Sequence, residues 1–248
     1  MKLNLLIAPD FAPERFAGWH MLNTLLQKRA DLHIHLETPA SAQEQGEQIA
    51  NKNIEIIYAN PFDAATMIRE QGYRAVARPK GKADEMVIAT KAEGQYKNLE
   101  DVKSGAKVAM ADNRDVKLIG LRLLEAVDLT ESDLSWHTTE TYQAAAREVI
   151  KGDADVGFFL SEVYHSLSRL TLSQLHVLIE SDLSDITHVV LVKEDFVESQ
   201  KFVDALLALT DSNDGKEVLQ ELGITDGFEA MSEEDGEFMI DLMDTLLD

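Results

Sequence analysis

The sequence predicts an α/β protein of two lobes, each built on a mostly parallel sheet with helices on both faces. Short apolar runs alternate with amphipathic segments along most of the chain, which is typical of strands that alternate with helices. The alternation occurs as two successive β-α series, separated by the polar segment KGKADE at residues 80–85. A chain of 248 residues also favours two lobes over a single one.

The first series contains four predicted strands and three predicted helices. Helical spacing of large apolar side chains identifies its first helix, and Pro61 and Gly72 mark the start and the end of its third. The predicted segments are strands at 3–8, 32–38, 53–60 and 74–79, and helices at 10–30, 41–52 and 61–72.

The second series and the end of the chain follow the same reasoning. The predicted strands are 86–91, 107–112, 134–139, 154–160, 175–181 and a long apolar strand at 187–196. The predicted helices are 98–105, 114–127, 140–152, 161–169, two within 198–223, and a terminal one within 231–248. Gly152 is expected to end the helix before it.

The composition excludes several classes of protein. The chain has 23 basic and 45 acidic side chains and a formal net charge of -22, which argues against nucleic acid and anionic membranes as partners. There is no cysteine, so disulfides, thiolate metal sites and cysteine nucleophiles are excluded. No segment approaches the roughly 20 apolar residues of a membrane-spanning helix.

The first ten residues, MKLNLLIAPD, bear on location. Their apolar run is too short for a secretory signal and lacks a small-residue cleavage site, so it reads as a first core strand. If Met1 is the natural start, we expect a cytoplasmic protein. If a signal peptide was removed, the alternative is the periplasm.

The segment 108–126 predicts a strand, a polar turn and a helix. The first N–H groups of a helix lack partners and can bind an anion. Here the turn contains Asn113, Arg114, Asp115 and Lys117. Asp115 opposes an anion, Arg114 and Lys117 attract one, and Asp112 or Asn113 can instead cap the helix. For any oxyanion that binds here, we expect Arg114 to matter more than Lys117, because Arg is a bidentate donor.

Five segments in chain order resemble the phosphate, phosphite and phosphonate-binding (PhnD-like) proteins. The resemblance is weak at each position but runs through nearly the whole chain. The segments are APDFAPERFAGWHMLNTLLQK, IIYANPFDA, NLEDVKSGAKVAMAD, TYQAAAREVIKGDADVGFF and GITDGFEAMSEEDGEFMIDLMDTL.

This resemblance implies the two-lobed type II periplasmic-binding-protein-like fold, with mixed sheets and a ligand bound in the cleft between the lobes. Lobe 1 would comprise residues 1–86 and 188–248, and lobe 2 residues 87–187. EMVIATK and THVVLVK would be the two crossing strands.

The resemblance also implies where a phosphonate would bind in lobe 2. In the family the turn after the strand carries Ser and Thr before a Gly, whereas the matching positions here are Asp115, Val116 and Lys117. A Ser-His pair at the next helix start corresponds to Thr141 and Tyr142. We therefore expect a degenerate oxyanion site that binds simple phosphate weakly.

Other candidates complete the expected binding site. An acidic residue that contacts amines in the family has no direct counterpart here, because its position is Leu160, followed by Ser161 and Glu162. In lobe 1 the candidates at strand ends are Phe11, Tyr58 and Asn60, where ligands of open α/β sheets gather. The alternative is that Phe11 and Tyr58 pack in the core and that Asn60 shapes a turn. Asp84 lies near the place of a family pocket tyrosine.

The sequence predicts no metal site, no cofactor and no catalytic residues. His33 and His35 face the same side of one strand, but no third ligand is apparent. No nucleophile elbow or Ser-His-Asp pattern is present.

The leading hypothesis is a non-catalytic solute-binding protein of the phosphonate transporter type, whose ligand is a small molecule with an oxyanion or an amine. One alternative is an enzyme on the same scaffold, with Asp84, Asp112 or Asp115 as the working carboxylate. Another is an interaction protein with a vestigial cleft, whose acidic face docks a protein partner.

Overall fold

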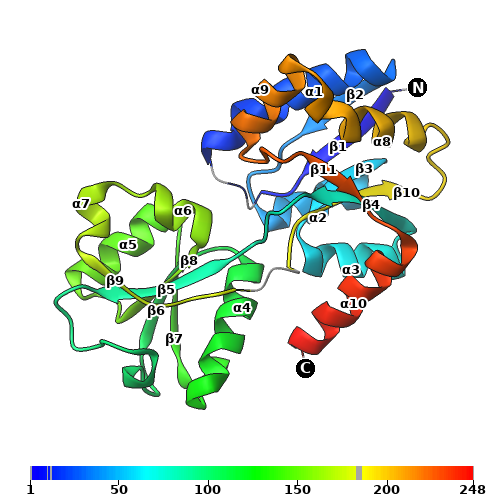
Figure 1. The fold of residues 1–248 in the computed structure, drawn as a ribbon. Helices are drawn as coiled ribbons and strands as arrows, with labels where there is room; N and C mark the ends of the chain where they lie inside the picture. The colour runs from blue at the N-terminus through cyan, green and yellow to red at the C-terminus, as the bar shows by residue number, and fades with distance from the viewer. Residues whose placement is uncertain (1, 10, 12, 183–185, 248) are drawn as a thin grey trace. The chain divides into compact units, whose positions relative to one another are not determined.

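The computed structural model of the chain describes residues 2–9, 11, 13–182 and 186–247 (Figure 1). The chain divides into two units that have separate sheets. Unit 1 comprises Met1–Ala83 and Ser184–Thr245, and unit 2 comprises Asp84–Leu183 and Leu246–Asp248. The boundaries expected from the sequence for the two ligand-binding lobes, 1–86 with 188–248 and 87–187, stay a prediction.

Unit 1 contains a six-stranded mixed sheet, here called sheet A, with the strand order β11-β4-β10-β3-β1-β2. β1 is parallel to β2 and β3, while β10 is antiparallel to β3 and β4, and β11 is antiparallel to β4. The strands are β1 (Lys2–Ile7), β2 (His33–Glu37), β3 (Ile56–Ala59), β4 (Tyr73–Pro79), β10 (Val189–Lys193) and β11 (Phe228–Ala230).

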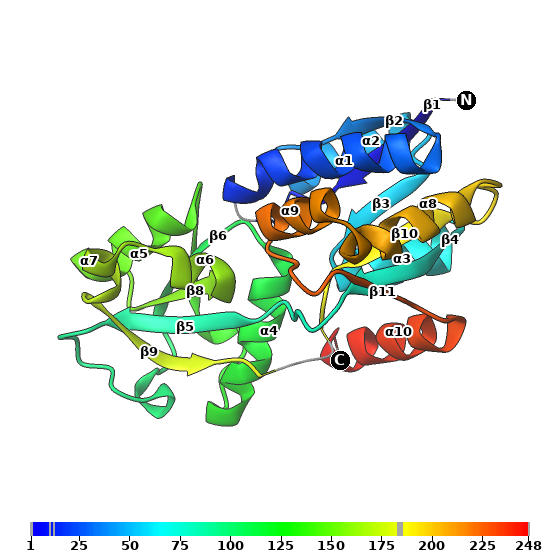
Figure 2. The same ribbon diagram turned by 45° about the horizontal axis from the view of Figure 1, so that its top comes forward.

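Helices cover both faces of sheet A. α1, α8 and α9 lie side by side on one face, and α3 and α10 lie on the other (Figures 1 and 2). The helices of unit 1 are α1 (Phe16–Ala30), α2 (Ala42–Asn51), α3 (Pro61–Glu70), α8 (Ser199–Leu207), α9 (Asn213–Leu222) and, up to Thr245, α10 (Glu233–Leu247), with 3-10 turns at Pro13–Arg15 and Ala208–Asp211.

The strand β3 shows why both faces need cover. Ile56 and Tyr58 belong to the core on the α1 side, whereas Ile57 and Ala59 belong to the core on the α3 side. All four side chains are buried, because successive residues of a strand point to opposite faces. A strand buried on both faces reads as a continuous apolar run, and this one does.

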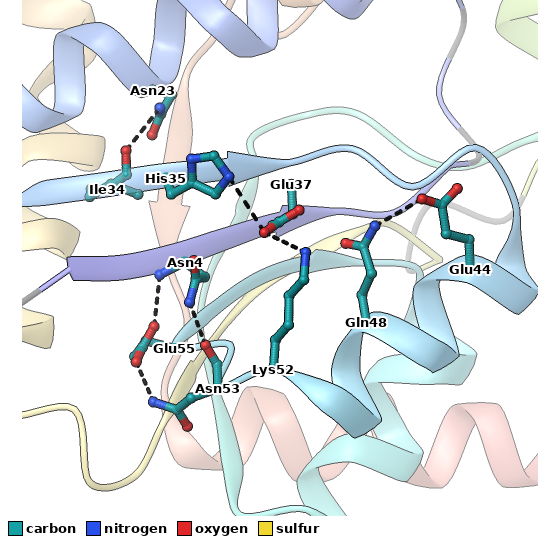
Figure 3. A network of polar contacts seen from close by, with 10 residues as sticks. All are labelled: Asn4, Asn23, Ile34, His35, Glu37, Glu44, Gln48, Lys52, Asn53 and Glu55. Carbon is teal, nitrogen blue, oxygen red and sulfur yellow. Dashed lines mark hydrogen bonds and ion pairs between the residues drawn. The ribbon is translucent and has the colours of Figure 1, made fainter.

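A polar network holds the start of β3 (Figure 3). Glu55 is 4% exposed. One of its carboxylate oxygens accepts the backbone N–H of Asn4 at 2.7 Å, and the other accepts the side-chain amide of Asn53. The Asn4 amide donates to the Asn53 carbonyl at 2.6 Å, and Lys193 Nζ donates to Asn53 Oδ1 at 2.7 Å. Because both oxygens of the buried carboxylate have partners, the network has a structural role.

Unit 2 contains a five-stranded mixed sheet, here called sheet B, with the order β7-β6-β8-β5-β9. β6 is parallel to β7 and β8, and β5 is antiparallel to β8 and β9. The strands are β5 (Met86–Lys91), β6 (Lys107–Ala111), β7 (Ser135–Thr139), β8 (Val156–Leu160) and β9 (Leu175–Glu180).

Two helices pack on opposite faces of sheet B. α5 lies over the core cluster that contains Phe159, whereas α4 approaches the other face, where Phe158 lies. A Cβ atom on Gly120 of α4 would lie 2.2 Å from the Phe158 ring, so glycine permits this close approach. The helices are α4 (Arg114–Leu124), α5 (Tyr142–Lys151), α6 (Ser161–Ser166) and α7 (Arg169–Leu172), with 3-10 turns at Leu99–Asp101, Glu125–Val127 and Glu131–Asp133.

The predicted fold class, α/β with mixed, mostly parallel sheets and helices on both faces, is confirmed. Several segments differ from the sequence-based expectation. The helix predicted at 98–105 is only a 3-10 turn, Leu99–Asp101, and the helix predicted at 10–30 becomes α-helical at Phe16, after a 3-10 turn. The sequence missed β11 and α7, which have three and four residues, and the strand expected at 187–196 spans only Val189–Lys193. Residues 10, 12 and 248 of the predicted helices lie outside the described residues. No helix in the described part of the chain has the length and apolar character to cross a membrane.

Candidate functional site

The topology of sheet B brings the unit 2 candidates to one edge. β6, β7 and β8 run in the same direction, so their carboxyl ends lie at a common edge, and antiparallel β5 begins there. The end of β9 reaches the same edge, because Glu180 pairs with Val87 near the start of β5. The residues around this edge are Asp84, Glu85, Asn113, Arg114, Asp115, Thr141, Tyr142, Ser161, Glu162 and Glu180.

The turn after β6 is a helix cap. The Asn113 side-chain oxygen accepts the backbone N–H of Val116 at 3.0 Å, as expected for an N-cap residue. Asp115 is 4% exposed in the first turn of α4, where its negative charge interacts favourably with the helix dipole. The helix start thus already has a capping side chain and a carboxylate, which disfavours a bound anion, while Arg114 is exposed.

Lys117 lies one turn into α4 and is held by other side chains. Its ammonium group forms an ion pair with Glu131 and lies 4.7 Å from the centre of the Trp136 ring. The Trp136 indole N–H in turn donates to the Glu131 carbonyl at 3.1 Å. The larger role that the sequence analysis expects for Arg114 at this turn stays a prediction.

Thr141 and Tyr142 follow β7 at the start of α5. Thr141 Oγ1 accepts the backbone N–H of Ala144 at 3.1 Å and caps the helix. The Tyr142 ring is half-buried, and its centre lies 6.3 Å from that of Phe159 in the core beneath α5. These contacts show capping and packing, and any role of the two residues in ligand binding stays a prediction.

Ser161 follows β8 and joins a polar cluster that the sequence analysis missed. Its hydroxyl donates to one carboxylate oxygen of Glu180, and His165 Nε2 lies 2.8 Å from the same oxygen. The hydrogen bond from Ser161, helped by His165, holds the pKa of the Glu180 carboxyl below its usual value although partial burial opposes this. Glu180 is therefore an oriented, charged carboxylate at the edge of sheet B.

Glu85 makes this edge still more acidic. Burial raises the pKa of its carboxyl, and the nearby charges of Glu180 and Asp182 raise it further, while His165 opposes them. Asp84, which precedes Glu85 in the sequence, is half-buried. Glu162, just after the end of the neighbouring strand β8, is also half-buried. Glu180 is the next-to-last residue of the strand predicted at 175–181, and this position was the signal that could have identified it, because carboxyl ends gather at one edge.

The carboxyl edge of sheet A has a different character. Tyr58, near the end of β3, is 7% exposed, and its ring centre lies 4.6 Å from that of Trp19 and 5.0 Å from that of His188. The ring of Phe11 is half-buried and lies edge-on to Trp19, with 6.0 Å between ring centres. The sequence identified Phe11 and Tyr58 as candidates but not His188, which comes one residue before β10.

Asn60, the third candidate of unit 1, caps α3. Its side-chain oxygen accepts the backbone N–H of Asp63 at 2.8 Å, and its amide donates to the Asp63 carboxylate at 3.1 Å. Gln45 donates to the same carboxylate at 2.9 Å. The turn-shaping role that the sequence left open for Asn60 is therefore present.

Within the described residues no group of three or more His, Cys, Asp or Glu side chains is placed to hold a metal ion. His33 and His35 are both exposed on β2, and His35 Nε2 lies 3.5 Å from Glu37 Oε1.

Comparison with known proteins identifies a family. The family model of the periplasmic substrate-binding protein of phosphonate ABC transporters matches residues 5–235, which confirms the resemblance inferred from the sequence. No curated protein sequence matches the chain significantly. The family model describes periplasmic proteins, so the expected cytoplasmic location receives no support, whereas the periplasmic alternative agrees with it.

Solved structures share the fold at low sequence identity. XAC2383 from Xanthomonas citri, bound to chloride ion, is 12% identical with a TM-score of 0.80, covering 100% of this chain and 99% of that one. PhnD1 from Prochlorococcus marinus, in complex with methylphosphonate, is also 12% identical with a TM-score of 0.80, covering 99% and 98%. The aliphatic sulphonate binding protein SsuA from Escherichia coli is 17% identical with a TM-score of 0.68, covering 99% and 91%.

Proposed function

Because this chain belongs to the family of periplasmic substrate-binding proteins of phosphonate ABC transporters, we propose that it binds a small organic molecule for a transporter and does not transform it. The ligand would be held by side chains at the carboxyl ends of the strands, where ligands of open α/β sheets collect. The location proposed for the chain is that of its family, the periplasm.

We propose further that the ligand carries an amine. The observation that carries this proposal is Glu180, which Ser161 and His165 orient and keep charged at the edge of sheet B. A positioned carboxylate is a strong acceptor for an ammonium group. The net charge of -22 also favours the approach of cations over that of anions.

The oxyanion part of the site is proposed to be degenerate. Asp115 and Val116 stand at the turn after β6 where the family has hydroxyl side chains, and Asn113 caps the helix. A hydrogen bond to a charged group contributes about 1.5–3 kcal/mol, so the loss of two hydroxyl donors weakens phosphate binding by orders of magnitude. We therefore expect no tight binding of inorganic phosphate.

The test uses pairs of compounds that differ only in the amino group. Taurine is compared with ethanesulfonate, and β-alanine with propionate, together with inorganic phosphate and methylphosphonate. A compound at about 100 times its dissociation constant stabilises the native state by roughly 2.7 kcal/mol, which a thermal-shift assay detects. We expect the amine member of a pair to raise Tm more, and calorimetry then gives its dissociation constant.

Variants connect the result to the proposed residue. Glu180→Gln keeps the shape of the side chain and removes its charge, so it should weaken the amine compound and leave its amine-free partner unchanged. Glu100→Gln, at an exposed residue of a 3-10 turn, is the matched control. Equal binding of both members of each pair would contradict the amine proposal, and micromolar phosphate affinity would contradict the degenerate oxyanion site.

The raised pKa of Glu85 supports a second candidate function, that of an enzyme on the same scaffold. Burial and neighbouring negative charges raise the pKa of its carboxyl, and such carboxylates occur at catalytic sites. Mass spectrometry of a bound compound after long incubation separates the two functions. A binding protein returns the compound unchanged, whereas an enzyme yields a product that Glu85→Gln no longer forms.

A further inference from the structure

The two tryptophans of the chain differ in how their indole N–H groups are satisfied. Trp136 Nε1 donates to the Glu131 carbonyl at 3.1 Å. Trp19, in the first turn and a half of α1, is 3% exposed, and its Nε1 is buried with no hydrogen-bond partner among the residues that the structure describes. Buried indole N–H groups usually have a partner, so Trp19 needs an explanation.

The surroundings of Trp19 place this donor at the edge of sheet A where ligands gather. Its ring lies 4.6 Å from that of Tyr58 at the end of β3, and the His188 ring stacks on Tyr58 at 5.0 Å and 21°. The end of β1 is joined to the same place, because the Ala8 N–H donates to the Tyr58 carbonyl at 2.9 Å. The Trp19 ring, which carries the unpaired indole N–H, therefore lies next to the strand ends and not deep beneath the sheet.

The atoms of Trp19, Tyr58 and His188 decide which kind of ligand they can bind. The Tyr58 ring contacts the rings of both Trp19 and His188, and Trp19 Nε1 offers one donor and no acceptor. The matching occupant is a small molecule with an oxygen acceptor.

We propose that Trp19, Tyr58 and His188 form a ligand subsite in unit 1, in which the Trp19 indole N–H donates to an oxygen atom of the ligand. This inference rests on the proposed function, since it assumes that the chain binds a small organic molecule. It adds Trp19 as a specificity-determining donor that selects molecules with an acceptor oxygen over simple amines.

The test follows the two indole N–H signals by proton–nitrogen correlation NMR of the whole chain. Trp19→Phe and Trp136→Phe assign the two signals, and the titration itself uses the wild-type protein. Taurine and β-alanine each have an amine and an acceptor oxygen, whereas ethylamine has the amine alone. We expect a saturable downfield shift of the Trp19 signal with taurine or β-alanine, no such shift with ethylamine, and an unmoved Trp136 signal.

Affinity measured by calorimetry gives an independent readout. Trp19→Phe should weaken the compound that shifts the signal about tenfold, which corresponds to about 1.4 kcal/mol, while Trp136→Phe leaves its affinity unchanged. A compound that binds the wild type but neither moves the Trp19 signal nor loses affinity in Trp19→Phe would overturn the subsite and leave the proposed function standing. No binding of any compound to the wild type would contradict both.

Discussion

The carboxyl edges of sheets A and B are built by the same backbone device but carry different side chains. In both, parallel strands end together and helices begin just beyond them. The edge of sheet A is aromatic, with Trp19, Tyr58 and His188 in ring contact. The edge of sheet B is acidic, with Glu85 and Glu180 close enough to influence each other. The backbone arrangement is therefore shared, and the side chains give the two edges different chemical character.

What the two edges have in common is capping. Asn60 in unit 1 and Asn113 and Thr141 in unit 2 each follow a strand and accept a backbone N–H from the next helix. These residues were ligand candidates in the sequence, and their capping contacts are explained without a ligand. The difference between the units therefore lies in the residues beside the caps.

The largest effect should come from the two tryptophans. Trp19→Ala removes a ring that is 3% exposed and should reduce the free energy of unfolding by about 3–5 kcal/mol. Trp136→Ala should cost clearly less, because that ring is half-buried and loses one hydrogen bond and one cation–π contact of about 0.5–1.5 kcal/mol each. Urea unfolding followed by circular dichroism measures both. Equal losses would contradict the expected difference between a fully buried and a half-buried tryptophan.

A smaller effect is expected from closing the gap between α4 and sheet B. Gly120→Ala places a methyl group 2.2 Å from the Phe158 ring and 2.9 Å from the Met86 side chain, so it should destabilise unit 2 by about 1–3 kcal/mol. Gly46→Ala is the control, because nothing lies within 4 Å and alanine favours a helix by about 0.8–1.0 kcal/mol. Thermal unfolding should show a lower Tm for the first variant and an unchanged or higher Tm for the second.

The caps provide a test of what the two edges share. Asn60→Ala and Asn113→Ala should each cost about 1 kcal/mol, because each leaves a helix N–H without its partner. Chemical denaturation measures the two losses side by side. If Asn113→Ala left stability unchanged but abolished binding of a compound, the turn after β6 would be a ligand site and its interpretation as a cap would be wrong.

The smallest effect concerns the two glutamates of sheet B, which should respond with opposite signs. The raised pKa of Glu85 means that folding disfavours its charged form, so Glu85→Gln should stabilise the protein at neutral pH, with the gain shrinking as the pH falls and wild-type Glu85 becomes protonated. The lowered pKa of Glu180 means that its charge stabilises the fold at neutral pH and that this contribution is lost as the pH falls. Glu180→Gln should therefore lower the free energy of unfolding of the protein at neutral pH. Stability measured between pH 4 and 8, around the usual carboxyl values near 4, checks both, and equal signs would contradict the assignment.

Much of the fold was predictable because its signals are local. The alternation of strands and helices, Pro61 at the start of α3 and Gly152 at the end of α5 are all visible in short windows of sequence. β11 and α7 were missed because three or four residues carry no clear periodicity. The match of the family model to residues 5–235 agrees with motifs that extend through most of the chain.

The sequence by itself determined the α/β class, the family and the residues at the strand ends, since these depend on patterns between near neighbours and on their order. Only the tertiary structure brought Ser161 and His165 to Glu180, and Trp19 and His188 to Tyr58. Glu180 lies 19 residues from Ser161 in the sequence, and the two meet because β8 and β9 flank β5 in sheet B. Strand order is set by packing of the whole unit, and neither the spacing nor the type of these residues reveals it.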